Sequence, residues 1–293
     1  MTEPIFHSRQ ICPNTWLIQG DGSNSYLVVG DRCGVLIDTG FSTENIREYA
    51  QKLTDIPVRM AANTHGHFDH TGGNGWFERA YMSAKALEIA KVPYPSKTLL
   101  DYPLNYLVTI VGDGDRIDLG GRVLQVIEVP AHAPSSIAFL DGKERIVFSG
   151  DEAARGVMLY WQQKEPQPTV EQHARNMEKL LMHRQEYDFI CSGHGEGLDD
   201  ASLVDVLLEH DQRIMSGNEG VQMEMKRDEP GGPSPEDFVM YQIEYKRASI
   251  YKDTFIGYDI RYVHNKCEEK NSVIGIPESD AKVAFAKNIS RGE

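Results

Sequence analysis

Residues 64–73 decide the fold, and they read THGHFDHTGG. Three histidines and one aspartate fall within six residues here, directly after the apolar run VRMAAN at 58–63. The first two histidines alternate as strand side chains do, so their imidazoles can face the same way. A turn would then present Asp69 and His70 to a neighbouring point. Because neutral imidazole and carboxylate suit zinc and also iron, the stretch predicts a metal site where a strand ends.

Three later segments repeat this layout, in which an apolar run leads to a histidine or an aspartate. They read VIEVPAH at 126–132, RIVFSGD at 145–151 and FICSGHG at 189–195. Small residues in each segment let the backbone approach a common point. Because sites in layered α/β folds lie where strands leave the core, the polar residue of each run is expected to join the cluster.

Short strands and helices alternate around these segments. Strand-like runs at 16–18, 25–29 and 34–38 precede an expected helix at 43–53. An amphipathic helix is expected at 169–182, where a threonine cap is followed three residues later by a glutamine. This rhythm of strand, helix and strand indicates a layered domain that mixes both element types.

The composition limits the classes of function. The 293 residues hold 30 Lys and Arg against 44 Asp and Glu, a net charge of −14. That charge argues against a nucleic-acid partner, because phosphate contacts need clustered cations. No signal-peptide pattern and no apolar run of about 18 residues occur, so we expect a cytoplasmic protein with no membrane span. The four cysteines are widely scattered and are expected to be free thiols: Cys12, Cys33, Cys191 and Cys267.

A change of character divides the chain after residue 227. The run DEPGGPSP at 228–235 predicts a linker. Residues 238–263 alternate aromatic and polar side chains with the period of two that is typical of a β-hairpin. We therefore predict a catalytic domain over 1–227, then a linker and a C-terminal β-rich extension over 228–293. The extension could form a lid over the site or a contact in a homodimer.

Together these segments resemble the metallo-β-lactamase superfamily over roughly residues 14–217. Residues 65–70 match its HxHxDH motif, the three later runs match its later His, Asp and His, and VLIDTG at 35–40 matches its first motif. The loop at 130–136 departs from the usual PGHTPGS-like sequence but keeps its histidine. The resemblance implies an α+β fold, a four-layer αβ/βα sandwich, here with a strand-rich C-terminal appendage.

The resemblance also implies two divalent metal ions, with zinc expected and iron or manganese as alternatives. The first ion would have three histidine ligands: His65, His67 and His132. The second ion would have a carboxylate and two histidines: Asp69, His70 and His194. Asp151 would bridge both ions, and Asp38 would orient a ligand histidine.

Such a site predicts a hydrolase of the glyoxalase II and lactonase-like branch. Two ions about 4 Å apart can share one hydroxide, whose pKa falls toward about 7, and can polarise a substrate oxygen. The expected reaction is attack of this metal-bridging hydroxide on a small ester, lactone or thioester. Asp69 would orient the hydroxide or relay its proton. Met158, Tyr160 and Trp161 follow the Asp151 strand and are candidate substrate-pocket residues.

Other functions fit parts of the pattern. A sulfur (persulfide) dioxygenase with one iron uses similar motifs, and the metal identity discriminates it from a hydrolase. A nuclease similar to ribonuclease Z conflicts with the acidic composition, and a non-catalytic scaffold conflicts with the complete ligand set. A glyoxalase II-like thioesterase stays possible, but residues 220–293 of this chain do not obviously match the basic helical region of such enzymes. Five other histidines are expected on the surface, one of them, His173, on a helix that could approach the cleft: His7, His173, His183, His210 and His264.

Overall fold

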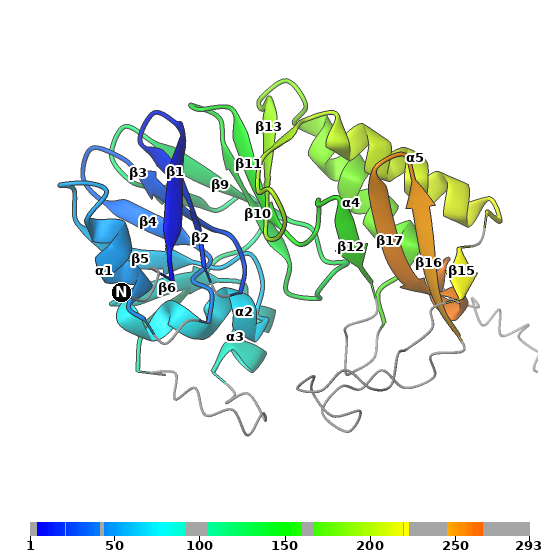
Figure 1. Ribbon diagram of the computed structural model, residues 1–293, viewed down its shortest axis with the longest axis horizontal. Coiled ribbons are helices and arrows are strands. Elements are labelled where there is room, and N and C mark those ends of the chain that lie inside the picture. The colour runs from blue at the N-terminus through cyan, green and yellow to red at the C-terminus, as the bar shows by residue number, and fades with distance from the viewer. Residues whose placement is uncertain are drawn as a thin grey trace, which may run out of the picture.

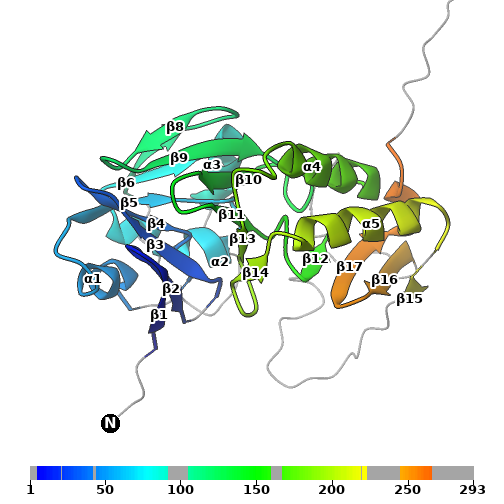
Figure 2. The same ribbon diagram turned by 90° about the horizontal axis from the view of Figure 1, so that it is seen from above.

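The computed structural model describes residues 5–20, 22–41, 44–91, 105–159, 167–218, 220–222 and 245–265. Two sheets pack face to face, and helices cover the outer face of each (Figures 1 and 2). A third, smaller sheet lies beside the helices of the second half (Figure 1). The arrangement confirms the predicted four-layer αβ/βα sandwich with a strand-rich C-terminal part.

The first sheet has its seven strands in chain order. They are β1 (His7–Cys12), β2 (Thr15–Gln19), β3 (Ser25–Val29), β4 (Gly34–Ile37), β5 (Val58–Ala62), β6 (Arg79–Met82) and β7 (Leu107–Ile110). The strands from β4 to β7 pair in parallel, so their carboxyl ends share one edge of the sheet. Two helices cover the outer face, α1 (Ile46–Gln51) and α3 (Ala84–Ala90). α1 starts after an Asn45 cap and is shorter than the helix predicted at 43–53.

The turn after β5 forms α2 (Phe68–Thr71) and the 3-10 helix η1 (Gly72–Trp76). The histidine-rich motif therefore begins at the carboxyl end of a parallel strand. This is the position that the sequence predicted for it.

The second sheet has the order β14-β13-β11-β10-β9-β8. Its strands are β8 (Arg116–Asp118), β9 (Val123–Glu128), β10 (Ile137–Asp141), β11 (Ile146–Gly150), β13 (Phe189–Ser192) and β14 (Asp199–Asp200). β10 and β11 are buried on both faces, because the first sheet covers one face and helices cover the other. Those helices are α4 (Val170–Met182) and α5 (Leu203–Met215), which lie side by side (Figure 2).

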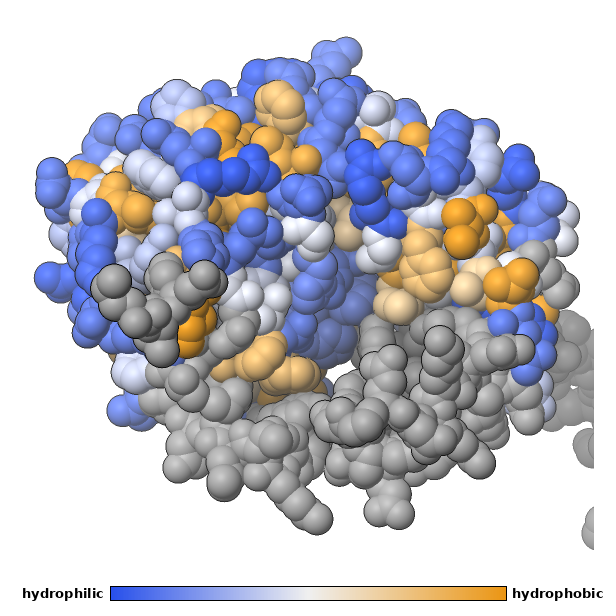
Figure 3. Space-filling model, in the orientation of Figure 1, coloured by the Kyte–Doolittle hydropathy of each residue, from blue (hydrophilic) through white to orange (hydrophobic). Residues whose placement is uncertain are grey.

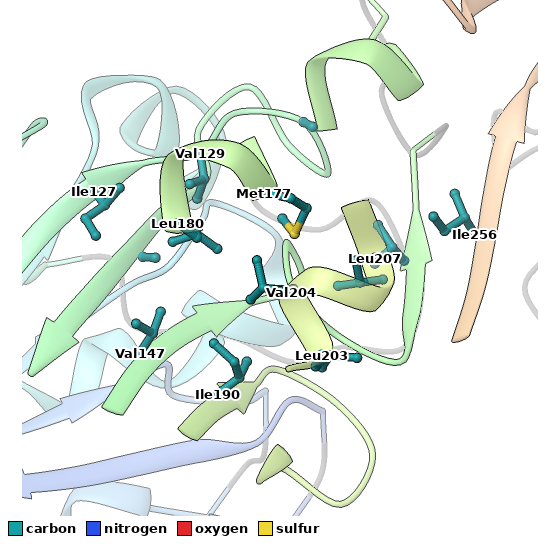
Figure 4. Close-up of a cluster of buried hydrophobic side chains, with 14 of the residues drawn as sticks. Ile127, Val129, Val147, Met177, Leu180, Ile190, Leu203, Val204, Leu207 and Ile256 are labelled. Carbon is teal, nitrogen blue, oxygen red and sulfur yellow. The ribbon is translucent and has the colours of Figure 1, made fainter. Parts of the chain in front are cut away.

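The core has an inner and an outer part around this second sheet. Between the two sheets, Tyr26 and Phe148 place their ring centroids 5.2 Å apart. On the outer face, Val147 and Ile190 of the sheet meet Met177 of α4, together with apolar side chains of α5 (Figure 4). Truncation of such a fully buried side chain to alanine costs about 2–5 kcal/mol, so this core fixes the helices on the sheet.

The third sheet joins the C-terminal strands to β12 (Gly156–Met158), which follows the second-sheet strand β11 in the chain. Its order is β12-β17-β16-β15, with β15 (Val221–Gln222), β16 (Lys246–Tyr251) and β17 (Thr254–Asp259). β16 and β17 form an antiparallel hairpin within the range where the sequence predicted one. The 3-10 helix η3 (Ile260–Tyr262) follows β17. The domain boundary at 227, the lid and the homodimer contact remain predictions.

No helix in the described ranges combines the length and the apolar character that a membrane crossing requires. Three of the four cysteines lie in the described ranges, and Cys12, Cys33 and Cys191 are free thiols there, as predicted. Cys267 lies outside the described residues.

Candidate metal centre

The first group of the site consists of three histidines on two segments. His65 Nε2 lies 2.9 Å from His67 Nδ1, and His132 Nε2 lies 3.1 Å from the same atom. His65 and His67 follow β5, whereas His132 follows β9 on the opposite sheet. The three nitrogens fall within 4.8 Å of one another and could hold one metal ion.

The second group consists of Asp69, His70 and His194, whose ligand atoms also lie within 4.8 Å of one another. Asp69 Oδ2 is 3.6 Å from His70 Nε2 and 3.4 Å from His194 Nε2. The short helix α2 carries the first two residues, and the segment after β13 carries His194.

Asp151, at the end of β11, lies between the two groups. Its Oδ2 is 3.5 Å from His132 Nε2 and 3.3 Å from His194 Nε2, and its Oδ1 is 3.5 Å from His70 Nε2. The structure thus brings together the side chains of all seven residues that the sequence singled out as ligands.

Two buried atoms of the site, His70 Nε2 and Asp151 Oδ1, have no hydrogen-bond partner among the residues that the structure describes. A buried polar atom left unpaired costs about 1–3 kcal/mol, so such atoms call for a partner. Imidazole nitrogens and carboxylate oxygens are the ligand set of zinc and related divalent metals. The residues therefore fit divalent metal ions.

The electrostatics separate the two groups. Burial and the neighbouring imidazoles hold the pKa of His67 down at about 3 and lower the pKa values of His65 and His132. These three rings are neutral and offer lone pairs. Burial opposes charge on His194, but Asp151 and Asp69 raise its pKa to about 9. The carboxylates therefore create a negative field around the second group that favours a bound cation.

Asp38 orients the ring of His70. Its Oδ2 accepts a hydrogen bond from His70 Nδ1 at 2.8 Å, and its Oδ1 accepts the Thr64 backbone N–H at 2.8 Å. This contact places the proton on Nδ1 and leaves Nε2 as the atom that faces the site. Asp38 has φ +55, a left-handed conformation that aspartate tolerates better than most residues.

His132 is oriented by two contacts from the second half of the fold. Its Nδ1 lies 2.9 Å from the carbonyl oxygen of Met158 in β12. Its backbone N–H donates to Oε2 of Glu152 at 2.8 Å. Glu152 is fully buried, and the sequence analysis did not identify it. The signal was a charged residue within the small-residue run GDEAA at 150–154.

A close approach of backbone at the site requires glycine at position 193. A Cβ there would collide with Asp151 Oδ1 and crowd the ring of His70. Glycine lets the segment before His194 pass directly under both side chains.

Two histidines contradict the expectation that they face solvent. His173 on α4 and His210 on α5 are both fully buried. His210 bonds Thr254 Oγ1 at 2.8 Å and Ser249 Oγ at 2.9 Å. The prediction was wrong for His210 because the β16–β17 hairpin covers its face of α5, and for His173 because Asp211 of α5 and the Glu152 carbonyl enclose its ring. His7 and His264 are exposed, and His183 is half-buried.

The predicted substrate pocket is only partly described. Met158 is half-buried and turns its carbonyl oxygen to His132. Tyr160 and Trp161 lie outside the described residues.

A four-layer sandwich with this histidine and aspartate cluster at its strand ends defines a class of metalloproteins. The family model described as "Metallo-beta-lactamase superfamily" matches residues 18–194, and the chain belongs to that superfamily. The family implies that the protein binds divalent metal. The matched range contains both ligand groups and ends at His194, so α5 and the hairpin lie beyond it.

Two characterised relatives and one solved structure are similar to the chain. The acyl-coenzyme A thioesterase MBLAC2 of Bos taurus is 29% identical over 208 residues, 60% of this chain and 74% of that protein. A hydroxyacylglutathione hydrolase of Vibrio campbellii is 25% identical over 193 residues, 64% of this chain and 63% of that protein. The metallo-beta-lactamase from Pontibacter korlensis has a TM-score of 0.55 at 20% identity, covering 70% of this chain and 97% of that chain, and it supports the fold.

Proposed function

We propose that the protein is a metal-dependent hydrolase of a thioester or ester, using two divalent ions, with zinc the first metal to test. The observation that carries the proposal is the pair of converging ligand groups, in which two buried atoms, His70 Nε2 and Asp151 Oδ1, lack a hydrogen-bond partner in the described part of the chain. Divalent ions held there would acidify water and polarise the carbonyl that is attacked. The names of the two relatives, a thioesterase and a hydrolase, favour an acyl thioester as substrate.

The side chains divide the work between them. His65, His67 and His132 would hold one ion with neutral rings, and Asp69, His70 and His194 would hold the other, with Asp151 shared. Asp69 keeps about a fifth of its side chain exposed, 22%, beside His194. Its carboxylate would therefore also be accessible to the attacking water, which it would orient or relieve of its proton.

An apolar rim lies beside the ligands and suits an acyl group. We define it as Phe41, Phe68 and Ile89. Phe68 is 36% exposed and Ile89 is 43% exposed, although both are large hydrophobic side chains. The Phe41 and Phe68 rings lie 5.5 Å apart, and Ile89 packs over Gly66 between the first two ligands. In the view of Figure 3, hydrophilic residues occupy the middle of the molecule and hydrophobic patches lie around them.

The test combines metal content with thioester cleavage. Protein purified without added metal is expected to hold about two zinc ions per chain and to release free thiol from acyl-coenzyme A thioesters. His67→Ala should abolish this release. The matched control is His183→Ala, which should retain it, because His183 is a half-buried residue at the C-terminal end of α4. A single iron per chain, with oxygen consumed on addition of a persulfide, would overturn the proposal in favour of sulfur dioxygenation.

A further inference from the structure

Glu152 is a buried carboxylate that connects the backbones of two candidate ligands. It follows Asp151 directly in the chain, and its side chain reaches across to the segment that carries His132. Oε2 accepts the N–H of His132 at 2.8 Å and the N–H of Ala131 at 3.3 Å. One residue therefore connects the end of β11 to the loop after β9, although Asp151 and His132 are 19 positions apart along the chain.

Two helices hold Glu152 from behind. Oε1 accepts from Asn176 Nδ2 of α4 at 2.6 Å. The backbone carbonyl of Glu152 accepts from His173 Nε2 at 2.9 Å, and His173 Nδ1 bonds Asp211 Oδ2 of α5 at 2.7 Å. All four side chains are almost completely buried. The side chain and the backbone of Glu152 are thus both fixed, and neither can shift without breaking contacts to α4.

His173 and Asp211 form a buried ion pair behind Glu152. Burial opposes charge on His173, but Asp211 and Glu152 raise its pKa to about 9. His173 thus contacts the carboxyl group of Asp211 through Nδ1 and the backbone carbonyl of Glu152 through Nε2. Buried ion pairs add little net stability, because the cost of desolvation offsets their attraction. Stability alone therefore gives a weak reason to bury three ionisable groups here, and proximity to the ligands gives a stronger one.

We propose that Glu152, held by Asn176 and by the His173–Asp211 pair, is a positioning residue that sets His132 relative to Asp151 for metal binding. This inference rests on the proposed metal site. Met158 sets the direction of the His132 ring, and Glu152 sets the backbone from which that ring extends. Loss of Glu152 leaves the His132 N–H without its acceptor, whereas the Ala131 N–H keeps the Val129 carbonyl oxygen at 3.0 Å. The loop must therefore move to satisfy the N–H of the ligand itself.

The test measures metal affinity, by competition with a chelator, on the full chain at equal folded concentration. Glu152→Ala is expected to weaken zinc binding by about 10–100-fold, the usual effect of losing a residue that orients a ligand. Glu152→Gln keeps one oxygen for the two N–H groups and should restore most of the affinity. With substrate, kcat should fall while KM changes little. The cobalt-substituted protein should show an altered visible spectrum.

Asp141 offers a matched control far along the same sheet. It is also a buried carboxylate whose Oδ1 accepts two backbone N–H groups, those of Lys143 at 3.1 Å and Glu144 at 3.2 Å. Its Oδ2 pairs with Arg122. Asp141→Asn should therefore lower the free energy of unfolding and leave zinc affinity unchanged.

The outcomes separate the two proposals. Wild-type affinity in Glu152→Ala overturns the positioning role, and so does an equal loss of affinity in Asp141→Asn, since a general loss of stability would then explain it. If Glu152→Ala does not fold, Asn176→Ala removes a single partner, and unchanged affinity there overturns the inference as well. A wild-type protein that binds no divalent metal would instead refute the proposed function.

Discussion

The two sheets hold their candidate metal ligands in different ways. In the first sheet, four ligands fall within six residues after β5, and Asp38 contacts the ring of His70 directly. In the second sheet, each ligand ends a separate strand, and Glu152 contacts the backbone that carries His132. The first arrangement is local and needs one acceptor from the neighbouring strand. The second arrangement depends on α4, α5 and β12, so it requires the whole second half to be folded.

The largest effect is expected at Asp151, because it lies between both groups. Asp151→Ala should reduce thioester turnover by about 10³-fold or more, on the scale of losing a major electrostatic contribution to catalysis. Measured metal content should fall below two ions per chain. Asp188→Ala is the control, since Asp188 is an exposed carboxylate paired with Arg145. Normal turnover in Asp151→Ala would show that the two halves do not share a ligand.

Asp38 tests the local half of the comparison. Asp38→Ala leaves the Thr64 N–H and His70 Nδ1 without their acceptor and places alanine at φ +55. The free energy of unfolding should fall by about 2–4 kcal/mol, measured by urea titration of the metal-free protein. Asn adopts a positive φ readily, so Asp38→Asn should lose less of the free energy of unfolding than Asp38→Ala. Equal losses in the two variants would contradict this account of Asp38.

A double variant sharpens the comparison of Asp38 with Glu152. If each carboxylate serves its own half, the losses of metal affinity in Asp38→Ala and Glu152→Ala should add in free energy. The measurement is a double-mutant cycle on zinc affinity. A coupling well above about 0.5 kcal/mol would show that the two halves adjust together through the shared Asp151.

The C-terminal hairpin should have a smaller effect, which reaches His132 through β12. His210→Ala removes the contacts to Thr254 and Ser249 that fasten the hairpin to α5. The free energy of unfolding should fall by about 1–3 kcal/mol, with only a slight loss of metal affinity. Deletion of 236–293 is a blunter test, because Ile256 and Tyr258 belong to the core beside α5. An unchanged unfolding curve in His210→Ala would remove the fastening role.

The same division explains what the sequence could predict. The HxHxDH turn needs few residues and one strand, so its pattern identified the first ligands and their place at a strand end. The sequence did not identify the roles of Glu152, Asn176 and His173, because their partners lie far along the chain, on helices whose packing partner was unknown. One signal was present: His173 and Asn176 share the buried face of α4 with Val170 and Met177. The hairpin was predicted, but its pairing with β12 could not be read from local alternation.

A pH dependence of stability is expected to come from His173. Its pKa is about 9 in the folded protein, against an ordinary value of 6.5. A raised folded pKa means that the stabilisation is fully present below about pH 6.5 and is lost as the pH rises through about 9. The titratable groups that interact with His173 are Asp211, Glu152 and His210. Burial raises the pKa of both carboxyls, so their contribution has the same sign. Burial, with the charges of His173 and Arg213, lowers the pKa of His210 to about 4, which is below the tested range.

Urea unfolding of chelator-treated protein between pH 6.5 and 9.5 measures this effect. The advantage of the wild type over His173→Gln should shrink as the pH rises, because the wild type alone loses a proton from that position. A difference that stays constant across this range would show that His173 is neutral in the folded protein. The second half would then be held by hydrogen bonds alone, and its contrast with the first half would rest on geometry and not on charge.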